Sequence, residues 1–204
     1  FTFDLDAETL WLARGVEEPV TLSQGRFGIL EGLPRILGAL RAAAIRASFF
    51  VPAWVAERYP ESVKAIAGEG PEVGCHGDVH ERVTDLERAR EHAILKKSLD
   101  VLTPLAGRRP VGYRAPAWQF SDATMGQVKA AGFLYDSSLQ ASDDPYELLM
   151  EKKPTGVIEL PIDWLNDDNA YFGGVANGSL PDPAPASTSD RTRCGWLSAT
   201  CSAV

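Results

Sequence analysis

The sequence has few cysteines, few basic residues and no long hydrophobic run, and each shortage excludes a class of protein. Its three cysteines, Cys75, Cys194 and Cys201, are an odd, unevenly spaced set that does not make a disulfide framework. Charges or prolines interrupt every apolar run well before ~18 residues, so no transmembrane helix is expected. Lys and Arg number 20 against 28 Asp and Glu, a net charge of −8. Because an acidic chain is a poor partner for a phosphate backbone, we expect no nucleic-acid partner and no membrane partner.

The N-terminus also lacks a recognisable leader, because no basic segment followed by an apolar stretch precedes the first strand. The sequence favours a cytoplasmic location, and secretion stays open because the chain starts at Phe1 rather than at Met. With 204 residues, 45% of them hydrophobic and 24% charged, the chain has the composition of a globular domain with one sizeable core.

Short apolar runs alternate with longer amphipathic segments, which predicts an α/β fold with a mainly parallel sheet. Strands are expected at 1–6, 46–51, 72–76, 111–114, 133–136 and 157–161. Helices are expected at about 33–44, 61–67, 84–106 and 121–131. Thr84 and Glu87 read as a capping box for the third helix, and Ser121 as the cap of the fourth. Residues 10–27 have no clear period and contain Gly15, Pro19 and Gly25, so we expect a long loop there.

The composition changes near Gly178, which predicts a domain over 1–177 and an irregular tail over 178–204. The tail has prolines in alternation, then Ser and Thr without an apolar period. It is either a flexible tail or a non-native, frame-shifted end, and both interpretations stay open. In either case we expect it to add no strand, which would leave apolar surface uncovered and favour a homo-oligomer.

Two of the three histidines lie in the segment HGDVH, directly after a predicted strand. Their i, i+4 spacing would place His76 and His80 on one helical face, where they could chelate one metal ion. This spacing alone is a weak signal, and two surface histidines are the alternative. The third, His92, lies mid-helix in REHAILKK and is expected to be solvated.

Charged side chains mark the ends of two other predicted strands. Asp4 and Asp6 are two residues apart, so their carboxylates point to the same side, either at a site or in a surface turn. Carboxylates that end an apolar strand are costly in a core unless they are paired or bind a cation. Arg114, in GYRAPAW, could orient a carboxylate through a bidentate pair.

Two further residues are candidates for substrate contact. Trp118 could wall a cleft or lie in the core. Asp136, followed by Ser137 and Ser138, ends a further strand either as a site residue or in a helix cap or turn. The combined pattern is stronger than any one member, because all the charged candidates lie at the carboxyl ends of predicted strands. In parallel α/β folds that edge carries the active site.

The segments FTFDLDAE, RASFFVP, EVGCHGDVHE, GYRAPAW and FLYDSS resemble, in this order, the motifs of the polysaccharide deacetylase family (carbohydrate esterase family 4). FDLDAE and ELPIDWLNDD are similar to the peptidoglycan-deacetylase-like and allantoinase-like subgroup. The resemblance implies a distorted, incomplete (β/α) barrel that hydrolyses a non-peptide C–N bond. It implies Asp4 as catalytic base, with Arg114 as its partner. The implied metal ligands are Asp6, His76 and His80.

The chain departs from this family at two points, because no histidine follows His92 and because the Pro/Ser/Thr tail stands where the family has the end of the barrel, as expected of a C-terminally truncated member. Family members carry a late histidine that serves as general acid, so we expect slow amide hydrolysis or none. Three functions stay open: deacetylation of N-acetylated sugars such as peptidoglycan or chitin, hydrolysis of a small cyclic amide or ureide, and metal or sugar binding without turnover. Zn²⁺ suits two His and one Asp, as do Co²⁺ and Ni²⁺. Tyr113, through a nearby backbone N–H, Trp118 and Asp136 complete the expected substrate site.

Overall fold

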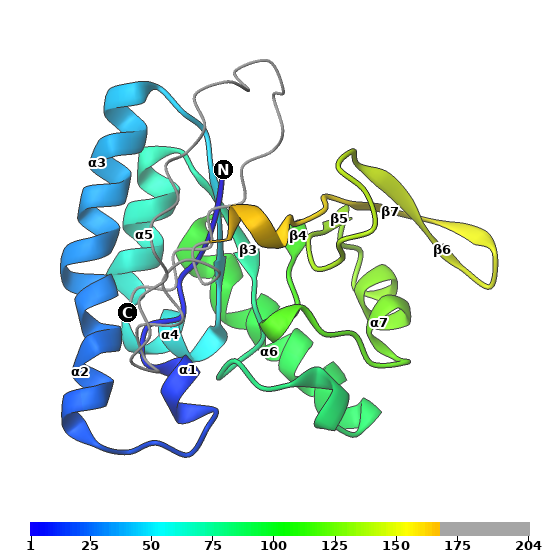
Figure 1. Ribbon diagram of the computed structural model, residues 1–204, viewed down its shortest axis with the longest axis horizontal. Coiled ribbons are helices and arrows are strands. Elements are labelled where there is room, and N and C mark those ends of the chain that lie inside the picture. The colour runs from blue at the N-terminus through cyan, green and yellow to red at the C-terminus, as the bar shows by residue number, and fades with distance from the viewer. Residues whose placement is uncertain (168–204) are drawn as a thin grey trace.

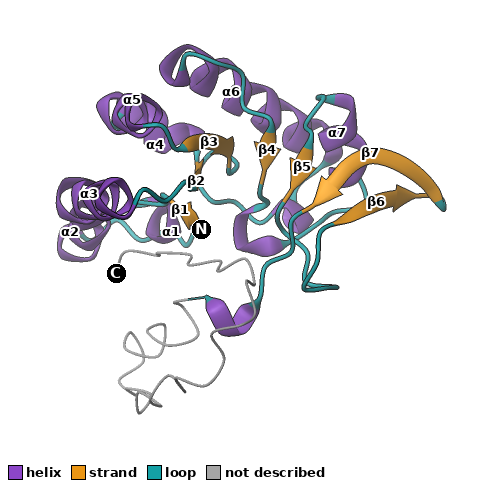
Figure 2. Cartoon of the chain, turned by 90° about the horizontal axis from the view of Figure 1, so that it is seen from above, coloured by secondary structure: helices purple, strands orange, loops and turns teal. Residues whose placement is uncertain are grey.

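The strands of the computed structural model, which describes residues 1–167, form one sheet in the order β1-β2-β3-β4-β5-β7-β6. The strands are β1 (Thr2–Asp4), β2 (Ser48–Val51), β3 (Glu72–Cys75), β4 (Gly112–Tyr113), β5 (Tyr135–Asp136), β6 (Tyr146–Met150) and β7 (Lys153–Glu159). Each strand from β1 to β5 is parallel to the next one in the sheet, and β5 is parallel to β7. Strand β6, at the edge, is antiparallel to β7. Figure 2 shows the strands as an open arc. The predicted α/β fold of an incomplete barrel is therefore confirmed within the described residues.

The longer helices cover the outer side of this arc (Figures 1 and 2). The helices are α1 (Thr9–Leu12), α2 (Pro19–Phe27), α3 (Leu33–Ala43), α4 (Ala53–Arg58), α5 (Pro60–Glu69), α6 (Arg88–Ala106) and α7 (Thr124–Ala130). A π-helical turn (Gly28–Gly32) joins α2 to α3. Leu33, Leu37 and Leu40 recur at helical spacing on α3 and are all buried in the core, as the sequence predicts.

The core lies between the helices and the sheet, and β2 shows why the strands read as apolar runs. Phe49, Phe50 and Val51 are consecutive and all buried, although successive side chains point to opposite faces of the sheet. A strand buried on both faces carries no polar alternation, which is typical of a parallel sheet covered on both sides.

The prediction of a long loop over residues 10–27 is wrong, because α1 and α2 occupy most of it. Pro19 lies in the first turn of α2, where its missing N–H costs nothing, and the Glu18 side chain accepts hydrogen bonds from the next two free backbone amides. Gly25 lies inside α2 for a steric reason. A Cβ there would lie 2.5 Å from the Ala7 backbone. Pro19 and Gly25, which suggested a loop, therefore both belong to a helix. Pro19 lies at its start, and Gly25 lets α2 lie close to the Ala7 backbone.

Two predicted helix starts are also displaced. Helix α6 begins at Arg88 after Glu87, and Thr84 lies in a separate 3₁₀ turn (Val83–Asp85), where its hydroxyl bonds the Gln119 side chain. The predicted capping box is therefore absent. Helix α7 begins three residues after Ser121, whose hydroxyl accepts from the amide of Ala123 in the preceding turn.

Strand β6 was not expected from the sequence. It forms a hairpin with β7 through Glu151 and Lys152, which both have positive φ values, 52° and 63°. Two-residue hairpin turns of this geometry favour Asn-Gly or Asp-Gly, so a Glu-Lys pair gives no turn signal. In Figure 1 the hairpin projects from the edge of the sheet.

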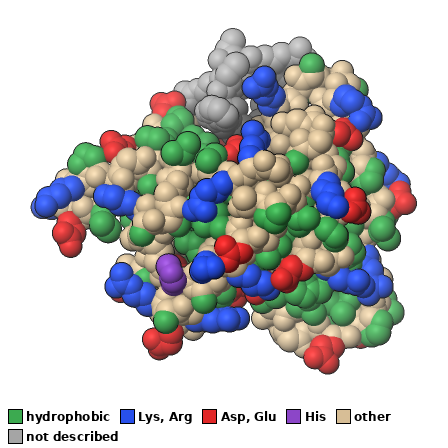
Figure 3. Space-filling view, turned by 180° about the vertical axis from the view of Figure 1, so that it is seen from behind, with side chains coloured by type: hydrophobic (Ala, Val, Ile, Leu, Met, Phe, Trp, Pro, Cys, Tyr) green, Lys and Arg blue, Asp and Glu red, His purple; other side chains and the backbone are tan. Residues whose placement is uncertain are grey.

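Within residues 1–167, no helix has both the length and the apolar character that crossing a membrane requires. Figure 3 shows Lys and Arg interspersed with Asp and Glu on the rear face, without a basic patch there. The predicted domain boundary at residue 177 and the tail over 178–204, with Cys194 and Cys201, lie outside the described residues.

Candidate metal centre and active site

The charged residues predicted from strand ends meet at one edge of the sheet. Asp4 is the last residue of β1 and Asp6 follows two positions later, while His76 and Arg114 come directly after β3 and β4. Because these strands are parallel, their carboxyl ends lie at the same edge. The sequence pattern therefore becomes a spatial cluster, as predicted.

Asp6, His76 and His80 offer one donor atom each, all within 4.8 Å of one another. Nε2 of His76 lies 3.5 Å from Oδ1 of Asp6, and Nε2 of His80 lies 3.9 Å from Oδ2 of Asp6. Oδ1 of Asp6 and Nε2 of His76 are buried and have no hydrogen-bond partner. Buried polar atoms are normally satisfied, so a shared cation fits this group well.

The other nitrogen of His76 fixes the state of its ring. Nδ1 lies 2.9 Å from the backbone oxygen of Arg114, which can only accept, so Nδ1 carries the proton. Nε2 is therefore the nitrogen that faces Asp6 and that would bind a metal ion. Burial lowers the pKa of His80, which favours the neutral imidazole that a metal also needs.

The helical argument for the two histidines is wrong, although the histidines do meet. His76 and His80 lie in the loop after β3, with ring centroids 5.2 Å apart. Gly77 and His80 have positive φ values of 69° and 60°, so the backbone turns back instead of forming a helix. Pro116 packs over Gly77, where a Cβ would lie 2.7 Å from the proline Cγ.

Burial also acts on the carboxylate of the cluster. In the protein without a cation, burial raises the pKa of Asp6 to about 7, and the charge of Asp4 adds to this while His76 opposes it. A cation would stabilise the ionised carboxylate and compete with that proton, so we expect metal binding to weaken as the pH falls below about 7.

Asp4 lies beside the cluster and contacts Arg114, as predicted. Nη1 of Arg114 donates to Oδ1 of Asp4 over 2.8 Å, and Oδ2 of Asp4 lies 3.8 Å from Nε2 of His76. Both side chains are buried. One carboxylate oxygen is therefore held by the guanidinium, and the other lies near the cluster.

Ser137, for which the sequence leaves a site role and a turn both open, holds Arg114 in place. Its backbone oxygen accepts from Nε of Arg114 over 2.8 Å, and its hydroxyl accepts from Nη2 over 2.7 Å. Thr2 accepts a further bond from Nη2, and the guanidinium lies 4.3 Å from the ring centroid of Phe50. The only signal for Ser137 was its place just past a strand end.

The side chains of Tyr113 and Asp136 both lie in the interior, which for Asp136 is contrary to its predicted substrate contact, while the role of a backbone N–H near Tyr113 stays a prediction. Tyr113 is the last residue of β4 and directly precedes Arg114, so its ring points to the opposite, helix-covered face, where its centroid lies 5.7 Å from that of Phe133. Asp136 is fully buried, and both its oxygens accept hydrogen bonds from Ser138. Burial and the neighbouring Glu159 raise its pKa well above the usual range. Asp136 therefore supports the strand end internally.

Trp118 lies on the loop after β4 and is half-buried. Trp118 and Ala117 have successive positive φ values of 54° and 52°, an uncommon conformation for residues other than glycine. Such backbone strain is concentrated at functional sites. The predicted role of Trp118 in walling a cleft stays a prediction.

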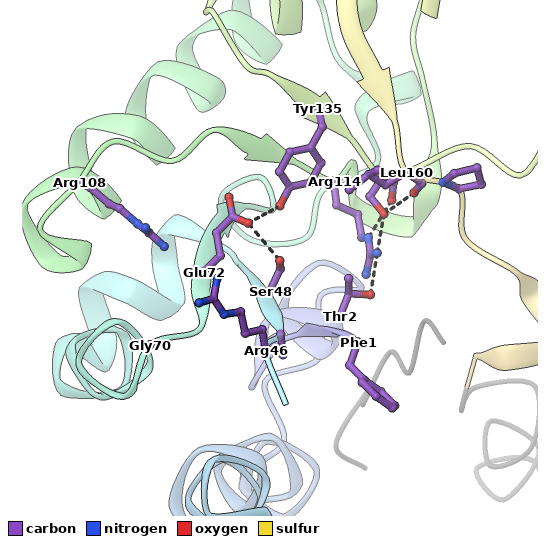
Figure 4. Close-up of a pocket in the computed structure, with 13 residues that line it drawn as sticks. Phe1, Thr2, Arg46, Ser48, Gly70, Glu72, Arg108, Arg114, Tyr135 and Leu160 are labelled. Carbon is purple, nitrogen blue, oxygen red and sulfur yellow. Dashed lines mark hydrogen bonds between the residues drawn. The ribbon is translucent and has the colours of Figure 1, made fainter. Parts of the chain in front are cut away.

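A pocket of about 310 Å³ has Arg114 in its lining (Figure 4). It is lined by the first residues of four strands, Thr2, Ser48, Glu72 and Tyr135. Figure 4 shows Ser48 and Tyr135 directed at the Glu72 carboxylate. The pocket contains none of the three metal-ligand candidates, so it is separate from the site at the carboxyl edge.

Comparison with known proteins identifies similar sequences and structures. The Polysaccharide deacetylase family profile matches residues 26–135. The Peptidoglycan deacetylase of Helicobacter pylori is 32% identical over 189 residues, which cover 81% of this chain and 64% of that protein. A crystal structure of a Mycobacterium smegmatis protein, assigned by its name to the polysaccharide deacetylases, is 37% identical with a TM-score of 0.77. That match covers 92% of this chain and 64% of the other.

A third match, the crystal structure of PuuE allantoinase, has a TM-score of 0.73 at 22% identity over 84% of this chain and 63% of that chain. At this identity the match shows a shared fold alone. The chain spans slightly less than two thirds of the length of each of these three proteins.

Proposed function

The chain belongs to the polysaccharide deacetylase family, and we propose that it is a metal-dependent hydrolase that removes acetyl groups from N-acetylated sugars of the peptidoglycan or chitin type. The observation that carries the proposal is the position of Asp4. Arg114 holds its carboxylate beside three side chains with the ligand set of a catalytic zinc site. The similar Helicobacter pylori protein, named a peptidoglycan deacetylase, supports the substrate class.

Asp6, His76 and His80 would hold the ion, with Zn²⁺, Co²⁺ and Ni²⁺ all suited to two imidazoles and a carboxylate. Such an ion, when bound, lowers the pKa of water toward ~7 and polarises an amide carbonyl. The protein's own contribution is orientation. The Arg114 carbonyl fixes the ring of His76, and burial keeps His80 neutral.

Asp4 acts as the base in this proposal. The Arg114 guanidinium donates to Oδ1, so Oδ2 is the oxygen that is free to take a proton. The protonated Asp4 can return this proton to the leaving amine. His92 is exposed on α6 and does not serve as the late acid of the family. Without a dedicated acid we expect slow turnover, because general acid–base help is typically worth ~10²–10⁴-fold.

One feature of the sequence favours a second candidate, hydrolysis of a small cyclic ureide. The segment FDLDAE around Asp4 and Asp6 is similar to allantoinase-like relatives. Acetate release from N-acetylglucosamine oligomers, and ring opening of cyclic ureides, should be measured on the purified chain with Zn²⁺ or Co²⁺. We expect slow acetate release that chelation abolishes. Ureide hydrolysis alone would favour the second candidate, and no turnover of either substrate would favour a binding protein.

The metal site has a direct test with a matched control. We expect His76→Ala and His80→Ala each to lose most of the bound divalent cation, because each removes one of three protein ligands. Elemental analysis after loading with Zn²⁺ would measure the metal content. His92→Ala removes the third, exposed histidine and should bind as much metal as the parent chain. Equal metal content in all the variants would contradict the assignment.

A further inference from the structure

The loop that carries both histidines is closed by the carboxylate of Glu81, the residue directly after His80. Oε1 and Oε2 of Glu81 accept from the backbone N–H of Asp78 over 2.9 and 3.2 Å, and Oε2 accepts from the N–H of Val79 over 2.7 Å. Glu81 itself is half-buried. One side chain therefore binds two successive amides that lie between the two ligand candidates.

The first half of the loop has other anchors. The carbonyl of Gly77 accepts from the N–H of Ala53 over 2.9 Å and from the hydroxyl of Ser98 over 2.8 Å. The Asp78 carbonyl accepts from the N–H of Trp54, and its carboxylate pairs with Lys97 over 2.8 Å. These contacts hold Gly77 and Asp78 against α4 and α6, so Glu81 acts on the part of the loop that leads into His80.

This second part needs support because of its backbone conformation. His80 has a φ of 60°, in the left-handed region that residues with a Cβ rarely adopt. Such a conformation persists when the surrounding contacts over-determine it. The bonds from Asp78 and Val79 to Glu81 tie the residues before His80 to the residue after it, which fixes the turn at His80.

We propose that Glu81 is a positioning residue that holds His80 in the orientation needed for cation binding and so raises the affinity of the Asp6, His76 and His80 cluster. The inference rests on the metal site of the proposed function. Glu81 is not a member of the ligand cluster, and its oxygens are directed at backbone amides. Partners that orient metal ligands typically account for about 10- to 100-fold in metal affinity.

The negative charge of Glu81 could raise cation affinity through space without positioning anything, and two variants separate these effects. Glu81→Asp keeps the charge but is one methylene shorter, so it should not reach both amides. Glu81→Gln keeps the length and one acceptor oxygen but has no charge. Positioning predicts that Glu81→Asp loses affinity, whereas a pure charge effect predicts that it binds like the parent chain.

The experiment is calorimetric titration of the purified chain with Zn²⁺ and Co²⁺, together with the visible absorption spectrum of the Co²⁺ form. We expect Glu81→Ala and Glu81→Asp to bind about 10- to 100-fold more weakly than the parent, with an altered Co²⁺ spectrum, and Glu81→Gln to lose less than Glu81→Ala. Glu61→Ala, at an exposed glutamate on α5, is the control and should bind normally. Thermal unfolding without metal checks that each variant is folded.

The outcomes distinguish the two proposals. If the parent chain binds neither cation, the metal site and the role of Glu81 are both overturned. If the parent binds and Glu81→Asp has the same affinity and spectrum, the positioning role alone is overturned and the metal site stands. Should Glu81→Ala fail to fold, Glu81→Asp and Glu81→Gln decide the question in its place.

Discussion

Replacing Asp4 by asparagine is expected to reduce turnover by about 10²- to 10⁴-fold while leaving the bound metal in place. Replacing Asp6 by asparagine, two residues along the same chain, is expected to remove the metal as well as the activity. The difference follows from geometry. Asp6 shares the metal cluster with both histidines, whereas Asp4 pairs with Arg114 and only borders the cluster. Metal content and acetate release, measured on the same preparations, would test both expectations.

The pair of variants is its own control, because both change a buried carboxylate of the same segment to the same amide. Asp100→Asn, at an exposed ion pair on α6, should change neither metal content nor turnover. Loss of metal in Asp4→Asn would contradict its role as a base outside the ligand set. Retained metal in Asp6→Asn would contradict its role as a metal ligand. Full turnover by Asp4→Asn would exclude it as the base and direct attention to another proton acceptor.

The sequence predicts the charged part of this site because strand ends can be read from apolar runs. Asp4, Asp6, His76 and Arg114 each follow such a run, and parallel strands bring their carboxyl ends together. The site could therefore be assembled without knowing any distance. For the two histidines the wrong step was to place HGDVH on a helix, because left-handed backbone at His80 leaves no trace in the residue pattern.

The residues that sequence reasoning missed or misplaced share a cause. Asp136 and Ser137 both lie at the end of β5, and a strand end alone does not say which of two successive side chains faces the site, because that depends on the register with the neighbouring strands. Register placed Arg114 on the inner face and the Tyr113 ring on the outer one. The prediction of a loop over residues 10–27 was wrong for a different reason. Gly25 is required by its contact with the Ala7 backbone, which is a tertiary constraint that the local sequence does not show.

The buried pair of Arg114 and Asp4 is also expected to dominate the stability of this edge of the sheet. Arg114→Met should lower the free energy of unfolding by about 3–5 kcal/mol, because it leaves the Asp4 carboxylate buried without its partner. It also removes the donors to Ser137 and Thr2. Urea unfolding of the metal-free chain, followed by two independent probes to check two-state behaviour, would give the difference.

A double-mutant cycle separates the pair from the general loss of a large buried side chain. In the Asp4→Asn background, Arg114→Met should cost clearly less, since no unpaired carboxylate remains. Arg35→Met, at an exposed pair with Glu31 on the surface, should change stability by less than ~1 kcal/mol. If Arg114→Met costs the same in both backgrounds, then packing and the bonds to Ser137 explain the loss. The guanidinium would in that case be a structural support of the strand end, and the orientation of Asp4 would need another cause.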